Sequence, residues 1–187
     1  MESYDILASL YDRHGSSDYI GEPISQLSHA LQCAALAQQS RPLDHEFIAA
    51  CLLHDVGELV GLDEKLSRTE WGTKSHDAIG YRFLQQLGFT QRVCDLVHEH
   101  ARAKRYLCFA DPQYYERLSI ASKNTLVQQG GIFDANQAAA WYAQSHAPDA
   151  VALRLIDDQG KSVYTLPTGN MQKEFSFYKN VILKSCN

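Results

Sequence analysis

Residues 47–58 read FIAACLLHDVGE, an apolar run that ends in a histidine, an aspartate and a glutamate. At helical spacing, Phe47, Cys51 and His54 share one face, and Asp55 shares the adjacent face with Ile48. Both faces should point inward, where an isolated carboxylate is costly to bury. A metal ion would be a partner for these side chains, and an imidazole beside a carboxylate suits iron, manganese or zinc.

The His-Asp pair is weak evidence by itself, because His76-Asp77 is a second such pair in the same chain. A larger set of potential ligands strengthens it. On separate predicted helices, the chain carries in order His29, His54-Asp55, His76, His100 and Asp157. Any one of these would more often be a core histidine or a surface charge, but the whole set predicts a pocket among bundled helices.

Helical faces indicate which other polar residues should point into that pocket. His100 lies on an apolar face with Lys104 one turn further on, whereas His98 points elsewhere. Arg154 lies three residues before Asp157, near the end of a late helix. One polar stripe combines Glu22, Gln26, His29 and Cys33. The remaining histidines have no such setting and are interpreted as surface residues: His14, His45 and His146.

Apolar residues recur mostly at helical spacing, which predicts an all-α helical bundle in a single domain, 1–187. The expected helices cover residues 3–13, 22–39, 44–59, 75–87, 90–103, 112–127, 134–144, 148–158 and 172–183. Residues 61–74 are expected to form a loop with short turns, and residues 163–166 a short strand. Asp44 is expected to cap the helix that carries His54 and Asp55.

The composition excludes several classes of function. The 187 residues are 45% apolar and carry a net charge of −5 with no run of Lys or Arg, which argues against a nucleic-acid or membrane surface. A small anionic substrate remains compatible with a few well-placed cations. Without a signal-peptide core or an apolar stretch as long as a membrane span, we expect a cytoplasmic protein. The five cysteines form no CxxC pair and are expected to be reduced thiols.

The pattern formed by His29, His54-Asp55 and Asp157 resembles the HD superfamily, which is named for these residue types. The added His76 and His100 resemble its dinuclear branch. Residues 19–33 (YIGEPISQLSHALQC) are similar to the PhnZ-like mixed-valent di-iron oxygenases, which cleave the carbon–phosphorus bond of hydroxyphosphonates. The similarity continues through residues 49–57, 100–107, 121–125, 129–131 and 154–157, and it leaves out the first helix and the tail after Gly160.

The resemblance implies two iron ions (Fe2+/Fe3+), with dioxygen and a small organophosphonate as substrates. The expected substrate is a 1-hydroxy-2-aminoethylphosphonate or an N-methylated analogue, cleaved to phosphate and an amino acid such as glycine. One iron would take His29, His54, Asp55 and Asp157, and the other His76 and His100 with Asp55 bridging. The phosphonate would be held by Lys104, Ser122, Thr125 and Arg154. Glu22 would attract the substrate ammonium, and Tyr19 would lie over the metal and move when substrate arrives.

Glu58 departs from the resemblance, because these oxygenases have a histidine at the corresponding position. A second acid near the pocket could bind a different cationic headgroup of the substrate, such as an N-methylated one. Alternatively, Glu58 could hydrogen-bond to a histidine that is itself a metal ligand. The sequence leaves both interpretations open.

Two other functions are compatible with the same ligand set. The first is a metal-dependent phosphohydrolase, in which manganese or magnesium would activate water to attack a phosphate ester or nucleotide. Residues typical of cyclic-dinucleotide hydrolysis are missing, since Glu58 rather than lysine follows Gly57. The second is an HD module without catalytic activity that senses a ligand, which is the weakest alternative because every metal and phosphonate position is filled.

Overall fold

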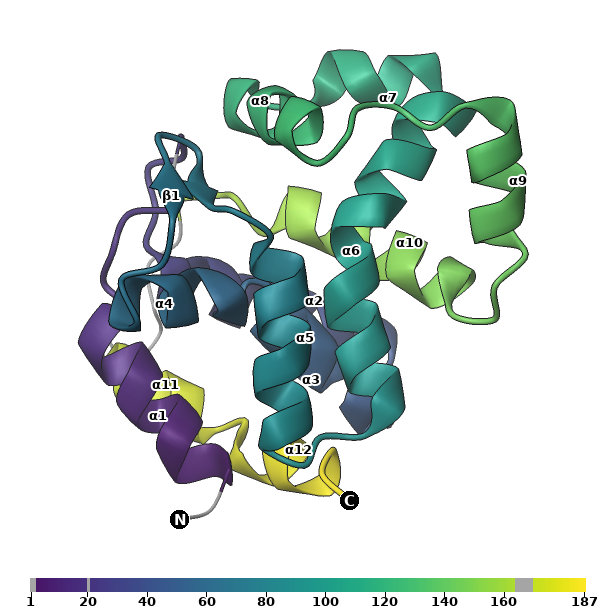
Figure 1. Ribbon diagram of the computed structural model, residues 1–187. Coiled ribbons are helices and arrows are strands. Elements are labelled where there is room, and N and C mark those ends of the chain that lie inside the picture. The colour runs from purple at the N-terminus through teal and green to yellow at the C-terminus, as the bar shows by residue number, and fades with distance from the viewer. Residues whose placement is uncertain (1–2, 20, 164–169) are drawn as a thin grey trace.

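The computed structural model describes residues 3–19, 21–163 and 170–187, and helices dominate them, which confirms the all-α prediction (Figure 1). The helices are α1 (Ser3–His14), α2 (Gln26–Ser40), α3 (His45–Leu53), α4 (Val56–Asp63), α5 (His76–Gln86), α6 (Gln91–Ala110), α7 (Pro112–Arg117), α8 (Ile120–Gln128), α9 (Ala135–Tyr142), α10 (Ala147–Gln159), α11 (Met171–Ser176) and α12 (Lys179–Lys184). A small antiparallel hairpin pairs β1 (Arg68–Thr69) with β2 (Gly72–Thr73).

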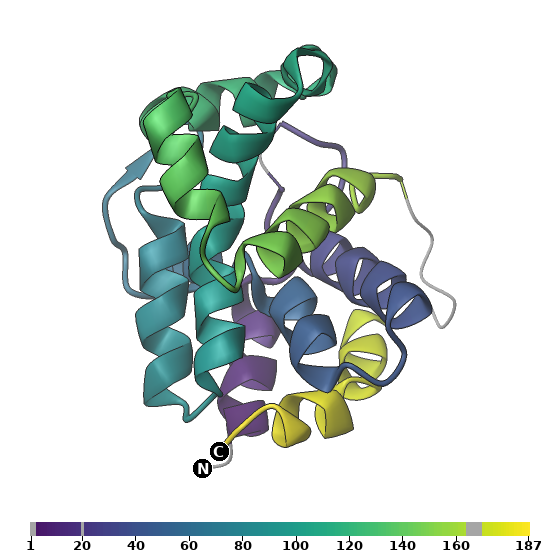
Figure 2. The same cartoon turned by 90° about the vertical axis from the view of Figure 1, so that its right-hand side faces the viewer.

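Helix α3 forms the centre of the hydrophobic core. Residues 47–53 have no exposed surface, because α2, α6, α10 and α12 surround the helix (Figures 1 and 2). Asp44 caps the helix as predicted, and its carboxylate accepts a hydrogen bond from the Phe47 N–H. The apolar run that precedes His54 is therefore fixed on all sides.

The helix that was expected to continue through Leu59 is broken immediately after this run. Helix α3 ends at Leu53 and α4 begins at Val56, so His54 and Asp55 lie at the junction. Gly57 lets α4 approach α5 closely, since a Cβ at this position would lie 1.9 Å from the His76 carbonyl oxygen. This close approach brings the start of α5, with His76, next to Asp55.

The start of α2 was predicted too early. Ser25 is the N-cap residue and its hydroxyl accepts a hydrogen bond from the Ser28 N–H, so α2 begins at Gln26. The preceding segment doubles back on itself, with the Tyr19 N–H donating to the Ile24 carbonyl oxygen at 2.9 Å. Glu22 is therefore part of a loop and not of the polar stripe on α2.

Helices in the second half are longer or more divided than predicted. Helix α6 continues to Ala110 instead of ending near residue 103, so Lys104 lies within it. The expected helix 112–127 is divided into α7 and α8, because the Ser119 hydroxyl caps α8 by accepting from the Ser122 N–H. The expected last helix is likewise divided into α11 and α12. Most of the strand expected at residues 163–166 lies outside the described residues.

Helices α7 and α8 have a small hydrophobic cluster of their own beside the end of α6. It consists of Cys108, Tyr114, Leu118 and Leu126 and is separate from the main core. Figure 1 shows α7 and α8 at the top of the molecule, above α4 and α5. This part of the chain therefore forms a cap.

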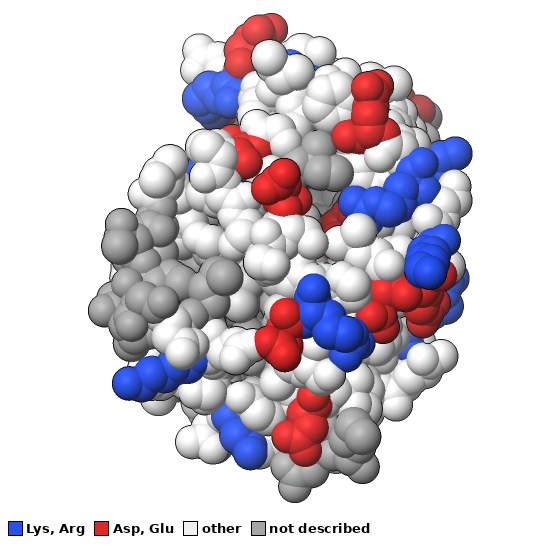
Figure 3. Space-filling model, turned by 90° about the vertical axis from the view of Figure 1, so that its left-hand side faces the viewer, with Lys and Arg blue, Asp and Glu red and all other residues white. Residues whose placement is uncertain are grey.

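The surface has a mixed charge on the face shown in Figure 3. Acidic and basic side chains alternate over its described part and do not gather by sign. No helix in the described residues is both long enough and apolar enough to span a bilayer. The cysteines of the chain are free thiols, and all but Cys186 are buried.

Candidate metal centre and substrate pocket

Four predicted ligands converge at the junction of α3 and α4. The Nε2 atom of His29 lies 3.1 Å from Nε2 of His54 and 3.3 Å from Oδ1 of Asp157. The Asp55 Oδ2 atom lies 3.2 Å from the same His54 nitrogen. Ligands on one metal ion with bonds of about 2.1 Å are separated by about 3.0–3.4 Å, so this spacing fits an ion.

A second group shares Asp55 with the first. The Nε2 atoms of His76 and His100 are 3.2 Å apart, and they lie 3.4 Å and 3.6 Å from Oδ1 of Asp55. The two carboxylate oxygens of Asp55 thus face different groups of histidines. This division fits a carboxylate that bridges two ions.

Hydrogen bonds fix the orientation of the histidine rings. The Nδ1 atoms of His29, His54 and His100 lie 2.9, 2.9 and 2.6 Å from the carbonyl oxygens of Gly160, Cys51 and Val97. Because a carbonyl oxygen can only accept, each Nδ1 carries a proton, and Nε2 is the nitrogen left to bind a metal ion. The Nε2 atoms face one another and the carboxylates, so the donor set fits two metal ions.

The charges of the site lead to the same conclusion. Burial alone would raise the pKa of Asp55, but His54, by its charge and its hydrogen bond, holds it well below its ordinary value. Burial likewise opposes ionisation of Asp157, whose pKa is held low by Arg154 and Lys161. Both carboxylates are therefore charged at neutral pH. Burial lowers the pKa of His100 to about 3, so that imidazole is neutral, whereas Asp55 outweighs burial and raises the pKa of His54 to about 9, so a metal ion would displace a proton from His54.

Cys33 is a further potential ligand beside the first group. Its Sγ atom lies 3.7 Å from Nε2 of His29, and its thiol donates to the Ile156 carbonyl oxygen at 3.9 Å. Burial raises the pKa of the thiol well above its ordinary value, with Asp157 adding to the effect. A neutral thiol is a poor ligand, so Asp157 is the better fourth member of this group.

A pocket adjoins the two ligand groups and is partly open to solvent, with a cavity volume of about 70 Å³. It is lined by every substrate-binding residue predicted from the sequence: Tyr19, Glu22, Glu58, Lys104, Ser122, Thr125 and Arg154. A small, partly open pocket with this polar lining suits a small polar ligand.

Three basic side chains line the pocket, and two of them hydrogen-bond to hydroxyl groups of α8. The Lys104 ammonium donates to the Thr125 hydroxyl at 2.7 Å, and the Lys161 ammonium donates to the Ser122 hydroxyl at 3.3 Å. Arg154, 4% exposed, lies in the same wall. Cations and hydroxyls in this arrangement can bind the oxygens of a tetrahedral anion.

Arg154 is held in place by acids on its own helix and by a tyrosine of α7. Its guanidinium lies 2.6 Å from Oδ2 of Asp157 and pairs with Asp158. The Nε–H donates to the Tyr114 hydroxyl at 3.0 Å, and this hydroxyl donates to Asp158. Arg154 therefore connects Asp157 with Tyr114 and Asp158 at the edge of the pocket.

Tyr19 lies over the first ligand group. Its ring stacks on the ring of His29 with centroids 4.1 Å apart, and its hydroxyl donates to Oδ1 of Asp157 at 3.5 Å. Burial raises the pKa of the phenol well above its ordinary value, so the hydroxyl keeps its proton. Glu22, on the same loop, is half-buried at the edge of the pocket.

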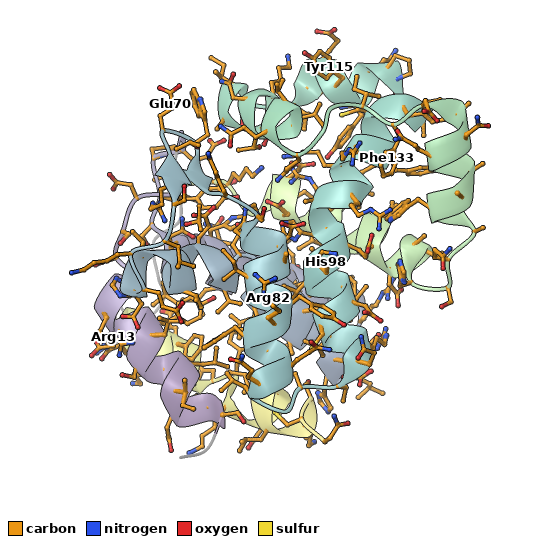
Figure 4. All side chains as sticks on the ribbon, viewed as in Figure 1. Arg13, Glu70, Arg82, His98, Tyr115 and Phe133 are labelled. Carbon is orange, nitrogen blue, oxygen red and sulfur yellow. The ribbon has the colours of Figure 1, made fainter. Side chains whose placement is uncertain are left out.

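His98 lies away from the centre, as its helical face predicted. The ring of His98 on α6, labelled in Figure 4, lies 5.4 Å from the ring of Tyr81 and 3.8 Å from Asp77. His14 and His146 are partly exposed, in contrast to the buried His29, His54 and His100. Sequence reasoning missed Lys161 and Trp71, which also line the pocket. Lys161 follows a glycine at a helix end, and Trp71 lies in a segment without periodicity, so neither had a helical face to reveal it.

A model of the HD domain matches residues 27–157, which include every residue of the two ligand groups. The chain belongs to the HD-domain family. One relative of this HD protein is a 1-hydroxy-2-(trimethylamino)ethylphosphonate dioxygenase from Leisingera caerulea that forms glycine betaine. It is 34% identical over 157 residues, or 84% of this chain and 79% of the relative.

Two further relatives extend the comparison. A hydroxymethylphosphonate dioxygenase from Gimesia maris is 35% identical over 157 residues, which cover 83% of this chain and 76% of the relative. An uncharacterized protein of Acanthamoeba polyphaga mimivirus is 28% identical over 185 residues, 98% of this chain and 82% of that protein. The resemblance to HD-domain phosphonate oxygenases is thus confirmed across most of the chain.

Proposed function

We propose that this HD protein is a di-iron dioxygenase that cleaves the carbon–phosphorus bond of a small 1-hydroxyphosphonate. The observation that carries the proposal is the division of the Asp55 carboxylate between two groups of histidines, beside a wall of three cations. The ligands of one ion would be His29, His54, Asp55 and Asp157. Those of the other would be His76, His100 and Asp55. Two relatives named as phosphonate dioxygenases support the choice of reaction.

The iron pair, when bound, would supply the redox chemistry with dioxygen. The protein side chains would bind and orient the substrate. Lys104, Arg154 and Lys161 would neutralise the phosphono group, and the hydroxyls of Ser122 and Thr125 would contact its oxygens. A phosphono group fixed in this way would hold the adjacent C1–H bond toward the metal ions.

The substrate would be a 1-hydroxy-2-aminoethylphosphonate or an N-methylated analogue. Glu22, whose carboxylate borders the pocket, would face the cationic end of the substrate. Tyr19 would cover the first ion and move aside as substrate arrives. The products would be phosphate and an amino acid such as glycine. One oxygen atom of O₂ would enter each product, so no external reductant would be needed for turnover.

The purified protein, loaded with iron and partly reduced with ascorbate, should consume O₂ and release phosphate in equal amounts. Three substrates would be compared: 1-hydroxy-2-aminoethylphosphonate, its N-trimethyl analogue and hydroxymethylphosphonate. Absence of O₂ uptake with all three would contradict the proposal. Release of phosphate from a phosphomonoester or nucleotide without oxygen, in the presence of manganese, would instead identify the metal-dependent phosphohydrolase.

Anion binding should weaken above neutral pH because of Lys104. Burial, with Arg154 nearby, lowers the pKa of this ammonium from 10.5 to about 7. The ammonium is charged below that pH and loses its proton above it, so affinity should be constant below about pH 7 and fall about tenfold per pH unit above it. Calorimetric titration with sulfate, a dianion throughout this range, measures the effect. A Lys104→Met variant should bind sulfate weakly at every pH. If its sulfate affinity still fell with rising pH, another group would be responsible for the pH dependence.

A further inference from the structure

The Glu58 carboxylate is buried, 8% exposed, and surrounded by hydrogen-bond donors. It accepts from the Thr73 N–H at 2.8 Å and lies 3.3 Å from the Arg68 guanidinium. The Nδ1 atom of His76 lies 3.3 Å from its other oxygen, at ion-pair distance. All three neighbours can donate, and only a carboxylate can accept from all of them. A glutamine would place its NH₂ group against at least one donor.

His76 differs from the other histidines of the centre in this respect. Nδ1 of His29, His54 and His100 lies beside a neutral carbonyl oxygen, whereas Nδ1 of His76 faces a charged carboxylate. A carboxylate in this position fixes the proton on Nδ1 and makes Nε2 a stronger ligand. The Nε2 atom of His76 is the one that faces His100 and Asp55.

The hairpin of β1 and β2 is built closely around the same carboxylate. Gly72 has a φ of +110°, and a Cβ there would lie 2.6 Å from Oε1 of Glu58, so a side chain is excluded. Arg68 also donates to the Thr73 hydroxyl at 2.6 Å, which ties both strands to Glu58. Trp71, between the strands, lines the pocket. Glu58 thus touches both the hairpin and a histidine of the centre.

We propose that Glu58 is a positioning residue for the second metal ion and not a ligand of the substrate. It holds the ring of His76 with Nε2 toward the site shared with His100 and Asp55. Its own oxygens are occupied by Thr73, Arg68 and His76, so the cationic end of a substrate is left to Glu22. This inference rests on the two-metal site of the proposed function, and it chooses between the two interpretations that the sequence left open for Glu58.

The test is a titration of the metal-free protein with Mn²⁺. Binding is monitored by calorimetry and by the electron paramagnetic resonance signal of the free ion. The wild type should bind two ions. Glu58→Gln should bind the first ion as before and the second about 10- to 100-fold more weakly. If Glu58→Gln bound each of the two ions as tightly as the wild type does, the inference would be overturned. If the wild type bound fewer than two ions, the two-metal basis of the proposed function would fail instead.

Arg68→Met is the matched control, because it loosens the hairpin and leaves the carboxylate beside His76. It should change Mn²⁺ affinity by less than about twofold, far below the loss expected when that partner is removed. An equal loss in R68M and E58Q would mean that Glu58 acts only through the hairpin. If E58Q does not fold, Glu58→Asp replaces it in the test. The shorter side chain withdraws the carboxylate from His76 by about 1.5 Å, so the affinity for the second ion should fall as in E58Q. Unchanged binding in E58D would then overturn the inference.

Discussion

Asp55→Asn should prevent the protein from holding two metal ions at once. It should also lower the rate of O₂ consumption by more than about 100-fold. Even residues that only orient metal ligands change metal affinity or activity by about 10- to 100-fold, and a bridging ligand should matter more. The asparagine keeps the size of the side chain but replaces one charged oxygen by a nitrogen that cannot bridge. In the wild type each oxygen faces a different group of histidines. Metal analysis of the purified variant, together with oxygen-electrode measurements, tests the expectation.

The chain contains its own control for that variant. Asp77 follows His76 in the second His-Asp pair, but its carboxylate faces His98 at 3.8 Å and not the metal centre. Asp77→Asn should therefore keep both ions and an activity within about twofold of the wild type, as is usual away from a functional site. Equal damage in D55N and D77N would show that the ligand set has been assigned wrongly.

Lys104→Met should weaken binding of phosphonate or sulfate by about 10- to 150-fold, the range for a lost hydrogen bond to a charged group. The same variant should be at least as stable as the wild type. Lys104 is 2% exposed, so removing its ammonium relieves a desolvation cost, and the Thr125 hydroxyl still donates to the Ser122 carbonyl oxygen. Calorimetric titration and thermal unfolding of the empty protein measure the two effects separately.

The pH dependence of unfolding gives a second measurement for this variant. In the wild type the folded pKa of Lys104, about 7, lies below the unfolded value of 10.5. The unfolded chain therefore binds more protons between these values, and the free energy of unfolding should rise with pH across that window. K104M should lack this contribution.

Arg154→Met is the matched comparison for K104M. It should weaken anion binding as well, but it leaves the buried Asp157 and the neighbouring Asp158 without their guanidinium partner. Breaking a buried ion pair in this way costs about 3–5 kcal/mol. The interpretation is that Lys104 serves anion binding and lowers the stability of the fold. If K104M lost as much free energy of unfolding as R154M, that interpretation would be contradicted.

Much of the centre could be predicted from the sequence, because its residues lie on helices whose faces are readable. The spacing of His100 and Lys104 placed both on the inner side of α6 and separated them from His98. The family resemblance then connected histidines from helices far apart in the chain. The structure brings those residues within ion-binding distance of one another.

Features that depend on tertiary contact could not be predicted in the same way. The break between α3 and α4 and the close approach of α5 to Gly57 are both features that helical periodicity does not record. The hairpin is too short to show strand alternation, and Lys161 lies two residues beyond α10. The environment of Glu58 could not be predicted either, because its hydrogen-bond donors come from the short hairpin and from α5.

The cap of α7 and α8 separates two tasks within one short chain. The proposed metal ligands are carried by the helices of the main core and by the junction of α3 and α4, whereas Ser122 and Thr125 lie on a helix that packs through Leu126 against the smaller cluster. Substitutions on the cap would thus reshape the end of the pocket proposed to receive the anion while the framework of the proposed metal centre stays unchanged. An ancestral HD scaffold with this division could acquire a new substrate by altering roughly one helix, without losing its ability to bind metal.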